Sequence, residues 1–171
     1  MKPIVSIIMG STSDLKVMEG AANFLEQQQI PFEMNALSAH RTPEQVLSFA
    51  AKARERGIRV IIAGAGGAAH LPGVIAAMTP LPVIGVPIKA SISMDGWDSM
   101  LSMIQMPPGI PVATVGMDNS TNAAILATQI LAVGDEAIMQ KVIDYKAGLS
   151  KKIEKANNDL AELKQWKMKT N

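Results

Sequence analysis

The 171-residue sequence predicts an α/β fold built on a five-stranded parallel sheet. Short apolar runs of strand length alternate along the chain with longer stretches of helical spacing. The strand-like runs are apolar on both faces, which is typical of a parallel sheet covered by helices on each side. Ligands bind such sheets at the carboxyl ends of the strands. The loops expected to carry function are therefore 10–14, 38–43, 64–73, 87–97 and 116–121.

Each expected element has a local signal in the sequence. The helix at 43–56 has the clearest start, because Thr42 suits the N-cap, Pro43 the first turn and Gln45 a capping box. Gly57 suits its end. The expected strands are 4–9, 32–37, 58–63, 83–86 and 112–115. The other expected helices are 15–29, 74–78, 98–106, the alanine-rich and buried 122–133, and 135–165, which could break near Gly148.

The chain is expected to form one domain over 1–171, with 135–171 as a helical C-terminal extension. This extension carries a narrow apolar stripe whose members recur every three or four residues: Leu149, Ile153, Ala156, Leu160 and Leu163. Such spacing suits a helix laid against another helix. Packing on its own domain stays open, but we favour packing on a neighbouring subunit.

Composition excludes several classes of protein. The absence of cysteine rules out disulfides, thiolate catalysis and thiolate metal sites. Two histidines are too few for a zinc site, and the net charge of +1 gives no general reason to expect nucleic-acid or membrane binding. No apolar run reaches the roughly 20 residues of a membrane helix, and the N-terminus lacks the features of a signal peptide. We therefore expect a cytoplasmic protein without a metal.

The first loop, GSTSD at 10–14, follows the first strand and opens the first helix. Gly10 allows a sharp turn, and the following hydroxyls, including Ser11 and Ser13, lie beside the free N–H groups of a helix N-terminus. That arrangement suits a phosphate. Asp14 could accept hydrogen bonds from a ribose diol. An ordinary N-cap would use the same residue types, so the motif alone leaves both interpretations open.

The second loop, SAHRTP at 38–43, follows the second strand. Ser38 and Arg41 can both hold phosphate, Arg41 through its charge and its forked geometry. His40 lies between them, and a histidine can transfer protons near neutral pH. A lone loop histidine more often only makes structural hydrogen bonds. Its neighbours and its place at a strand end favour the functional interpretation.

The third loop, AGAGGAAHLPG at 63–73, contains a G-x-G-x-x-A pattern. We reject a dinucleotide site because Pro72 and Gly73 should interrupt the helix that would hold the pyrophosphate. In addition, no acidic residue occurs between positions 57 and 94. The small residues are instead expected to let a ligand approach backbone N–H groups closely. His70 either contacts this ligand or only caps the turn.

Together these loops resemble the N5-carboxyaminoimidazole ribonucleotide mutases, the class I branch of the aminoimidazole ribonucleotide carboxylase family. The resemblance extends from residue 4 to about residue 133. The matching motifs are GSTSD (10–14), SAHRTP (38–43), AGAGGAAHLPGV (63–74), GWDSMLSMIQMPPGIPVATV (96–115) and NAAILA (122–127). Each motif is weak alone, but five in this order are specific.

The resemblance implies a flavodoxin-like, three-layer αβα fold, a homo-octamer and an isomerase of de novo purine (IMP) biosynthesis. The implied reaction interconverts N5-carboxyaminoimidazole ribonucleotide and 4-carboxy-5-aminoimidazole ribonucleotide. It proceeds by decarboxylation, trapping of carbon dioxide and attack by the ring carbon, with His40 as general acid and base. No metal, biotin, ATP or other cofactor is implied. The implied partners are the small-molecule ribonucleotide and, transiently, the ATP-dependent synthetase that forms the carbamate.

The resemblance also assigns the substrate-binding residues. Phosphate and ribose contacts are implied for Ser11, Ser13, Asp14, Ser38 and Arg41, and Ala39 is a further implied substrate-binding residue. The carboxylate or trapped carbon dioxide would lie against Gly66, Ala69, His70 and Leu71. Two alternatives remain: a carboxylase that uses carbon dioxide directly, and a non-catalytic ribonucleotide-binding module. Arg41 favours the mutase, because the class that uses carbon dioxide usually has lysine there.

Overall fold

The computed structural model describes residues 2–162, and its centre is a five-stranded parallel sheet in the order β2-β1-β3-β4-β5. The strands are β1 (Val5–Met9), β2 (Phe32–Ala36), β3 (Val60–Gly66), β4 (Val83–Ile88) and β5 (Ala113–Thr114). The helices are η1 (Thr12–Asp14), α1 (Leu15–Gln27), α2 (Pro43–Lys52), α3 (Leu71–Met78), α4 (Trp97–Ile104), α5 (Ser120–Ala132) and α6 (Glu136–Ala161). This strand order is that of flavodoxin-like folds, so the predicted fold class is confirmed.

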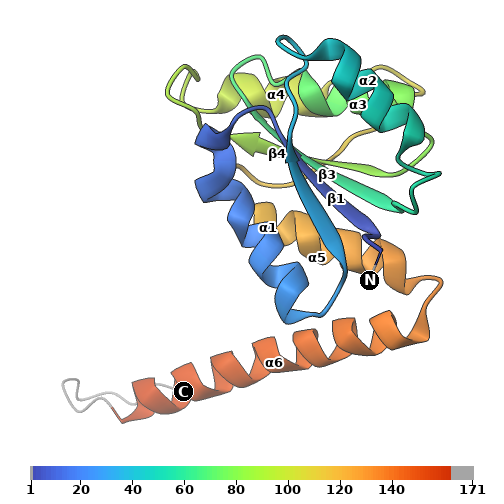
Figure 1. Cartoon of the computed structure of the whole chain (residues 1–171). Coiled ribbons are helices and arrows are strands. Elements are labelled where there is room, and N and C mark those ends of the chain that lie inside the picture. The colour runs from blue at the N-terminus through green and yellow to red at the C-terminus, as the bar shows by residue number, and fades with distance from the viewer. Residues whose placement is uncertain (1, 163–171) are drawn as a thin grey trace. The chain divides into compact units, whose positions relative to one another are not determined.

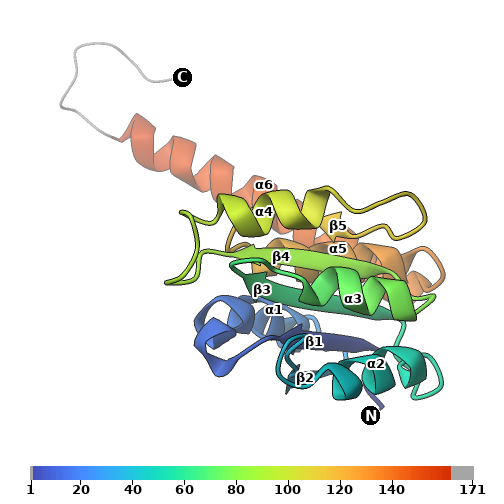
Figure 2. The same cartoon turned by 90° about the horizontal axis from the view of Figure 1, so that it is seen from above.

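Helices cover both faces of the sheet. Helices α2, α3 and α4 lie on one face, and α1 and α5 lie on the other (Figures 1 and 2). Strands β1, β3 and β4 are buried along almost their whole length, as their uninterrupted apolar sequences predict. The result is the three-layer αβα arrangement expected from the sequence.

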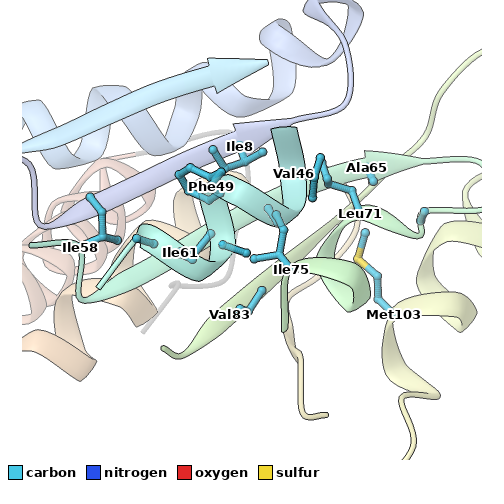
Figure 3. Close-up of a cluster of buried hydrophobic side chains, with 14 residues drawn as sticks. Ile8, Val46, Phe49, Ile58, Ile61, Ala65, Leu71, Ile75, Val83 and Met103 are labelled. Atoms are coloured by element: carbon cyan, nitrogen blue, oxygen red, sulfur yellow. The ribbon is translucent and has the colours of Figure 1, made fainter. Parts of the chain in front are cut away.

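The core beneath α2, α3 and α4 is a cluster of aliphatic side chains with one aromatic ring (Figure 3). Ile8 and Ile61 contribute from the sheet, Val46 and Phe49 from α2, and Ile75 from α3. Full burial of one such side chain contributes about 1.5–3 kcal/mol. This packing gives the carboxyl ends of β1 and β3 a rigid support.

On the opposite face, α1 and α5 approach closely at Gly20. A Cβ at this position would lie 2.8 Å from Ser120 Oγ, so a larger residue would separate the two helices. Ser120 Oγ in turn accepts a hydrogen bond of 3.1 Å from the Ala21 N–H group. The alanines Ala123 and Ala124 of α5 are fully buried. The expectation of a buried alanine-rich helix is therefore confirmed.

Several predicted boundaries were wrong for local physical reasons. Helix α3 begins at Leu71, three residues before the expected start, because Pro72 occupies the first turn, where a proline needs no N–H partner. Pro72 and Gly73 therefore do not interrupt a helix, and only the missing acidic residue still argues against a dinucleotide site. Helix α2 ends four residues early, at Lys52, and the turn after it closes at Gly57, where φ is +99°.

The chain divides into two compact units, Met1–Leu131 and Ala132–Asn171. Helix α6 of the second unit is capped by Asp135, whose side chain accepts hydrogen bonds from the N–H groups of Ala137 and Ile138. It is continuous through Gly148, so the break considered there does not occur. No helix within residues 2–162 is long and apolar enough to cross a membrane.

The predicted apolar stripe of the extension lies along α6. Leu149, Ile153, Ala156 and Leu160 are all exposed, whereas Leu163 lies outside the described residues. The single-domain assignment and the packing of the extension on neighbouring subunits stay predictions.

Candidate functional site

A pocket of about 460 Å³ opens where β1, β2, β3 and β4 end. Its walls are Gly10, Ser11, Ser13, Asp14, Ser38, Ala39, His40, Arg41, Ala65, Gly66, Ala69, His70, Leu71, Ala90, Ser91 and Ile92. The eleven residues singled out from the sequence are all among them. The pocket lies beside the β1/β3 pair, the position at which flavodoxin-like sheets bind their ligands.

The first wall is the short turn η1 after β1. The Ser11 side chain caps this turn by accepting a hydrogen bond of 3.3 Å from the Ser13 N–H group. Asp14 is only 7% exposed, and the Ser13 hydroxyl donates to its Oδ1 at 3.3 Å. Burial raises the pKa of Asp14, while the hydrogen bonds from Ser13 and Ser11 and the charge of Arg41 oppose this rise. The wall thus combines hydroxyl donors with one carboxyl acceptor.

The second wall is the turn Ser38–Thr42, which the Thr42 hydroxyl closes. Thr42 Oγ1 accepts from the Ser38 N–H group at 3.0 Å and donates to the Ser38 carbonyl at 3.2 Å. The predicted capping box is therefore wrong, because the Thr42 side chain makes no hydrogen bond to helix α2. Arg41 crosses from this turn to the first wall, where its Nη2 donates to the Gly10 carbonyl at 2.8 Å. Arg41 thereby places a permanent positive charge beside the hydroxyls of both walls.

His40 and His70 meet across the pocket. His40 Nε2 lies 2.8 Å from His70 Nδ1, and the two rings are nearly perpendicular. At this distance one nitrogen donates and the other accepts, so the pair holds one proton between the two rings. Both side chains are exposed to the pocket opening. A proton can therefore pass between the rings and on to a bound molecule.

The loop that forms the third wall is shorter than the predicted 64–73. Strand β3 continues to Gly66 and helix α3 begins at Leu71, so the loop is 67–70. Close packing requires glycine at two positions of this segment, Gly64 and Gly66. A Cβ on Gly66 would lie 2.6 Å from the Cβ of Ala90, and a Cβ on Gly64 would collide with the Met18 side chain. Ala69 adopts a φ of +49°.

The sequence interpretation missed five lining residues: Gly10, Ala65, Ala90, Ser91 and Ile92. Three of them, Ala90, Ser91 and Ile92, belong to the expected loop 87–97. The signal for this loop was its place after a predicted strand, because ligands bind parallel sheets at the carboxyl ends of the strands. The expected loop 116–121 contributes no lining residue. It instead contacts the loop that does line the pocket, because Asp118 Oδ1 accepts a hydrogen bond of 3.0 Å from the N–H group of Lys89, the neighbour of Ala90.

No group of three or more His, Asp or Glu side chains within residues 2–162 could hold a metal ion. The expectation of a metal-free reaction stays a prediction.

Fold and pocket together define a flavodoxin-like α/β protein whose site can bind a phosphorylated small molecule and transfer a proton. Residues 4–152 match the sequence model of the family described as AIR carboxylase. The chain belongs to this family.

Individual relatives agree with the family match. The N5-carboxyaminoimidazole ribonucleotide mutase of Pyrococcus horikoshii is 56% identical, over 95% of this chain and 91% of its own length. The phosphoribosylaminoimidazole carboxylase of Candida glabrata is also 56% identical, but the match covers 84% of this chain and 25% of that longer protein. The crystal structure of Treponema denticola PurE superposes with a TM-score of 0.82 at 31% identity, covering 92% of this chain and 98% of that one.

Proposed function

We propose that this protein interconverts N5-carboxyaminoimidazole ribonucleotide and 4-carboxy-5-aminoimidazole ribonucleotide, as an isomerase of purine biosynthesis. The observation that carries the proposal is the 2.8 Å contact between His40 and His70, in a pocket whose other walls hold hydroxyls and Arg41. A ribonucleotide needs an anion site, and moving a carboxylate from nitrogen to carbon needs a proton carrier. The pocket offers both.

The substrate phosphate is assigned to the first two walls. Arg41 supplies positive charge, and Ser11, Ser13 and Ser38 supply hydroxyl donors. Among the described residues, Asp14 is the carboxylate that lines the pocket, and its acceptor oxygens suit the ribose hydroxyls. With the phosphate and ribose bound in this way, the aminoimidazole ring would lie next to the two histidines, with Ala39 beside it.

His40 carries the proton in both halves of the proposed reaction. As the bond from the exocyclic nitrogen to the carboxylate carbon breaks, His40 protonates that nitrogen and carbon dioxide is released. The ring carbon C4 then forms a bond to carbon dioxide, and its proton returns to His40. Substrate and product are isomers, and the enzyme ends in the protonation state in which it began. Between the two steps the transferred proton resides on the exocyclic nitrogen, and His40, now neutral, keeps its hydrogen bond to His70.

The third wall is assigned to the released carbon dioxide. Gly66, Ala69 and Leu71 offer small or apolar surfaces, and His70 lies beside them. Carbon dioxide held there stays close to its acceptor, which replaces an encounter in solution by a step within one complex. A small apolar recess also disfavours the competing reaction with water.

A carboxylase that takes carbon dioxide from solution is the second candidate, because the longer relative from Candida glabrata is named a phosphoribosylaminoimidazole carboxylase. The relative matched over 91% of its own length is named a mutase, which favours the mutase for this chain. Arg41 in place of lysine favours it as well. The two activities differ in whether the initial rate depends on bicarbonate.

The test is turnover of enzymatically generated N5-carboxyaminoimidazole ribonucleotide, without bicarbonate or metal and with a chelator present. We expect product above the non-enzymatic rate, a loss of turnover of at least about 100-fold in His40→Asn, and product affinity within about tenfold of wild type. Activity only on the decarboxylated ribonucleotide with bicarbonate would favour the carboxylase. Ribonucleotide binding without either activity would indicate a binding module.

The cellular location and the oligomeric state of the enzyme are also proposals. We infer a cytoplasmic homo-octamer that acts on a free ribonucleotide without a cofactor. Because the carbamate is labile, transient contact with the ATP-dependent synthetase that forms it would shorten its exposure to water.

A further inference from the structure

The loop 67–70, which ends at His70, includes backbone conformations that are unfavourable for most residues. Gly67 and Ala69 both have positive φ, +61° and +49°. The left-handed region is unfavourable for a residue with a Cβ, so Ala69 keeps this conformation only where the surroundings impose it. The backbone hydrogen bond within the loop runs from the Ala69 N–H group to the Gly66 carbonyl at 3.2 Å. Contacts from outside the loop must therefore fix it.

Two serine hydroxyls from a later part of the chain supply such contacts. Ser93 Oγ accepts a hydrogen bond of 3.0 Å from the Gly67 N–H group. Ser102 Oγ, on helix α4, donates to the Ala68 carbonyl at 2.8 Å. The loop is thus held at two consecutive residues, one through its donor and the other through its acceptor. Neither serine lines the pocket.

Ser93 also organises the strap 89–97, which follows β4 and carries Ser93. Its Oγ accepts a second hydrogen bond, of 3.1 Å, from the Ala90 N–H group. Apolar burial contributes little to this strap, because its large side chains Ile92, Met94 and Trp97 are 82%, 74% and 61% exposed. A segment without such burial depends on its hydrogen bonds for a defined position. Ser93 therefore joins two pocket walls, the strap and the His70 loop.

We propose that Ser93 and Ser102 are positioning residues for the reaction, holding the Gly67–His70 loop so that His70 stays within hydrogen-bond distance of His40. The proposal rests on the proposed function for its kinetic consequence, but its structural content is independent of it. A hydrogen bond of 2.8 Å weakens steeply when one partner moves or tilts. Removing either hydroxyl releases one of the two points that hold the loop.

The first experiment reads the histidine pair directly. The chain has two histidines, so ¹⁵N-histidine labelling of the tag-free protein gives spectra of His40 and His70 alone. We expect Ser93→Ala and Ser102→Ala to shift these ring signals, and Ser102→Thr, which keeps the hydroxyl, to restore them. Ser48→Ala is the matched control, because Ser48 is an exposed serine on α2. This readout needs no turnover, so it holds even if the proposed function fails.

The second experiment measures whether Ser93 acts through His70. Ser93→Ala should lower turnover of the carbamate by about tenfold, because small misplacements of catalytic groups are costly. Its Tm should fall by only about 4–8 °C, as for the loss of the two hydrogen bonds that Ser93 Oγ accepts. The double variant with His70→Asn should then lose no more than His70→Asn alone. The same cycle is measured in product affinity, which gives a result even where turnover is too low.

Two results would overturn the proposal. One is a set of His40 and His70 signals that stay unchanged in both alanine variants. The other is a Ser93→Ala penalty of equal size in the wild-type and His70→Asn backgrounds, which would make Ser93 an ordinary structural residue. Wild-type protein without turnover on the carbamate would instead contradict the proposed function.

Discussion

Asp14 is the residue at which binding and stability conflict most clearly. Its carboxyl group is almost fully buried in the first wall, and burial is the largest cause of its raised pKa. The hydrogen bonds from Ser13 and Ser11 compensate only in part. A buried carboxylate that is not fully compensated costs folding free energy, and such a cost is common where a site must recognise a polar ligand.

We predict that Asp14→Asn stabilises the folded protein at neutral pH while weakening ribonucleotide binding. Since the pKa of Asp14 is raised on folding, ionisation favours the unfolded chain. The cost is absent below the ordinary carboxyl pKa and complete above the raised one. The gain should be about 0.5–2 kcal/mol at about pH 7 and vanish at about pH 3. Denaturant unfolding at both pH values checks this, and an equal gain at both would contradict it.

The location of the same carboxylate at the pocket follows from the local sequence. Asp14, Ser11 and Ser13 could be placed at the pocket from the sequence, because a strand followed by a helix start fixes their position locally. The contact between His40 and His70 could not be predicted, since it depends on two loops 30 residues apart. Ser93 gave no signal either, because its two N–H partners come together only in the folded chain.

At the scale of elements, the strands and the loops after them were predictable, while helix starts were less so. Uninterrupted apolar runs identify buried strands whatever their neighbours are. Pro72 was taken as an interruption although it opens α3, since sequence alone does not distinguish the first turn of a helix from its interior. Thr42 was assigned to a capping box, but its hydroxyl bonds backward to Ser38. One local interaction, the turn Ser38–Thr42, thus replaces another, the helix cap.

The two hydrogen bonds between the Thr42 hydroxyl and Ser38 lead to a prediction about the turn Ser38–Thr42. Thr42→Val removes both hydrogen bonds to Ser38 while keeping the shape of the side chain. We expect kcat/KM to fall by about tenfold through misplacement of His40 and Arg41. The helix content by circular dichroism should stay unchanged, because the Thr42 side chain does not cap α2.

Thr42→Ser is the control for this turn, since it keeps the hydroxyl and should retain most of the activity. A Thr42→Val variant with wild-type kinetics would mean that the backbone alone, including the 2.9 Å bond from the Thr42 N–H group to the Ser38 carbonyl, holds the turn.

At the scale of the whole molecule, the two units carry different features: one the pocket, the other an exposed apolar stripe. The described residues that line the pocket belong to the unit ending at Leu131. In the second unit, helix α6 repeats apolar residues at helical spacing and leaves them exposed. An exposed apolar stripe of this kind is typical of an interface. The predicted association with neighbouring subunits gives the stripe a role.

We therefore predict that charge on this stripe breaks the assembly. In a variant with Leu149→Glu and Ile153→Glu, two carboxylates would have to be buried at the subunit interface. The molar mass from sedimentation velocity should fall from that of an octamer to a smaller species. Asn158→Glu is the control, because Asn158 lies nine residues from Leu149 and hence on the opposite side of α6. It should leave the mass unchanged. If the double variant sediments like wild type, the stripe is not the interface.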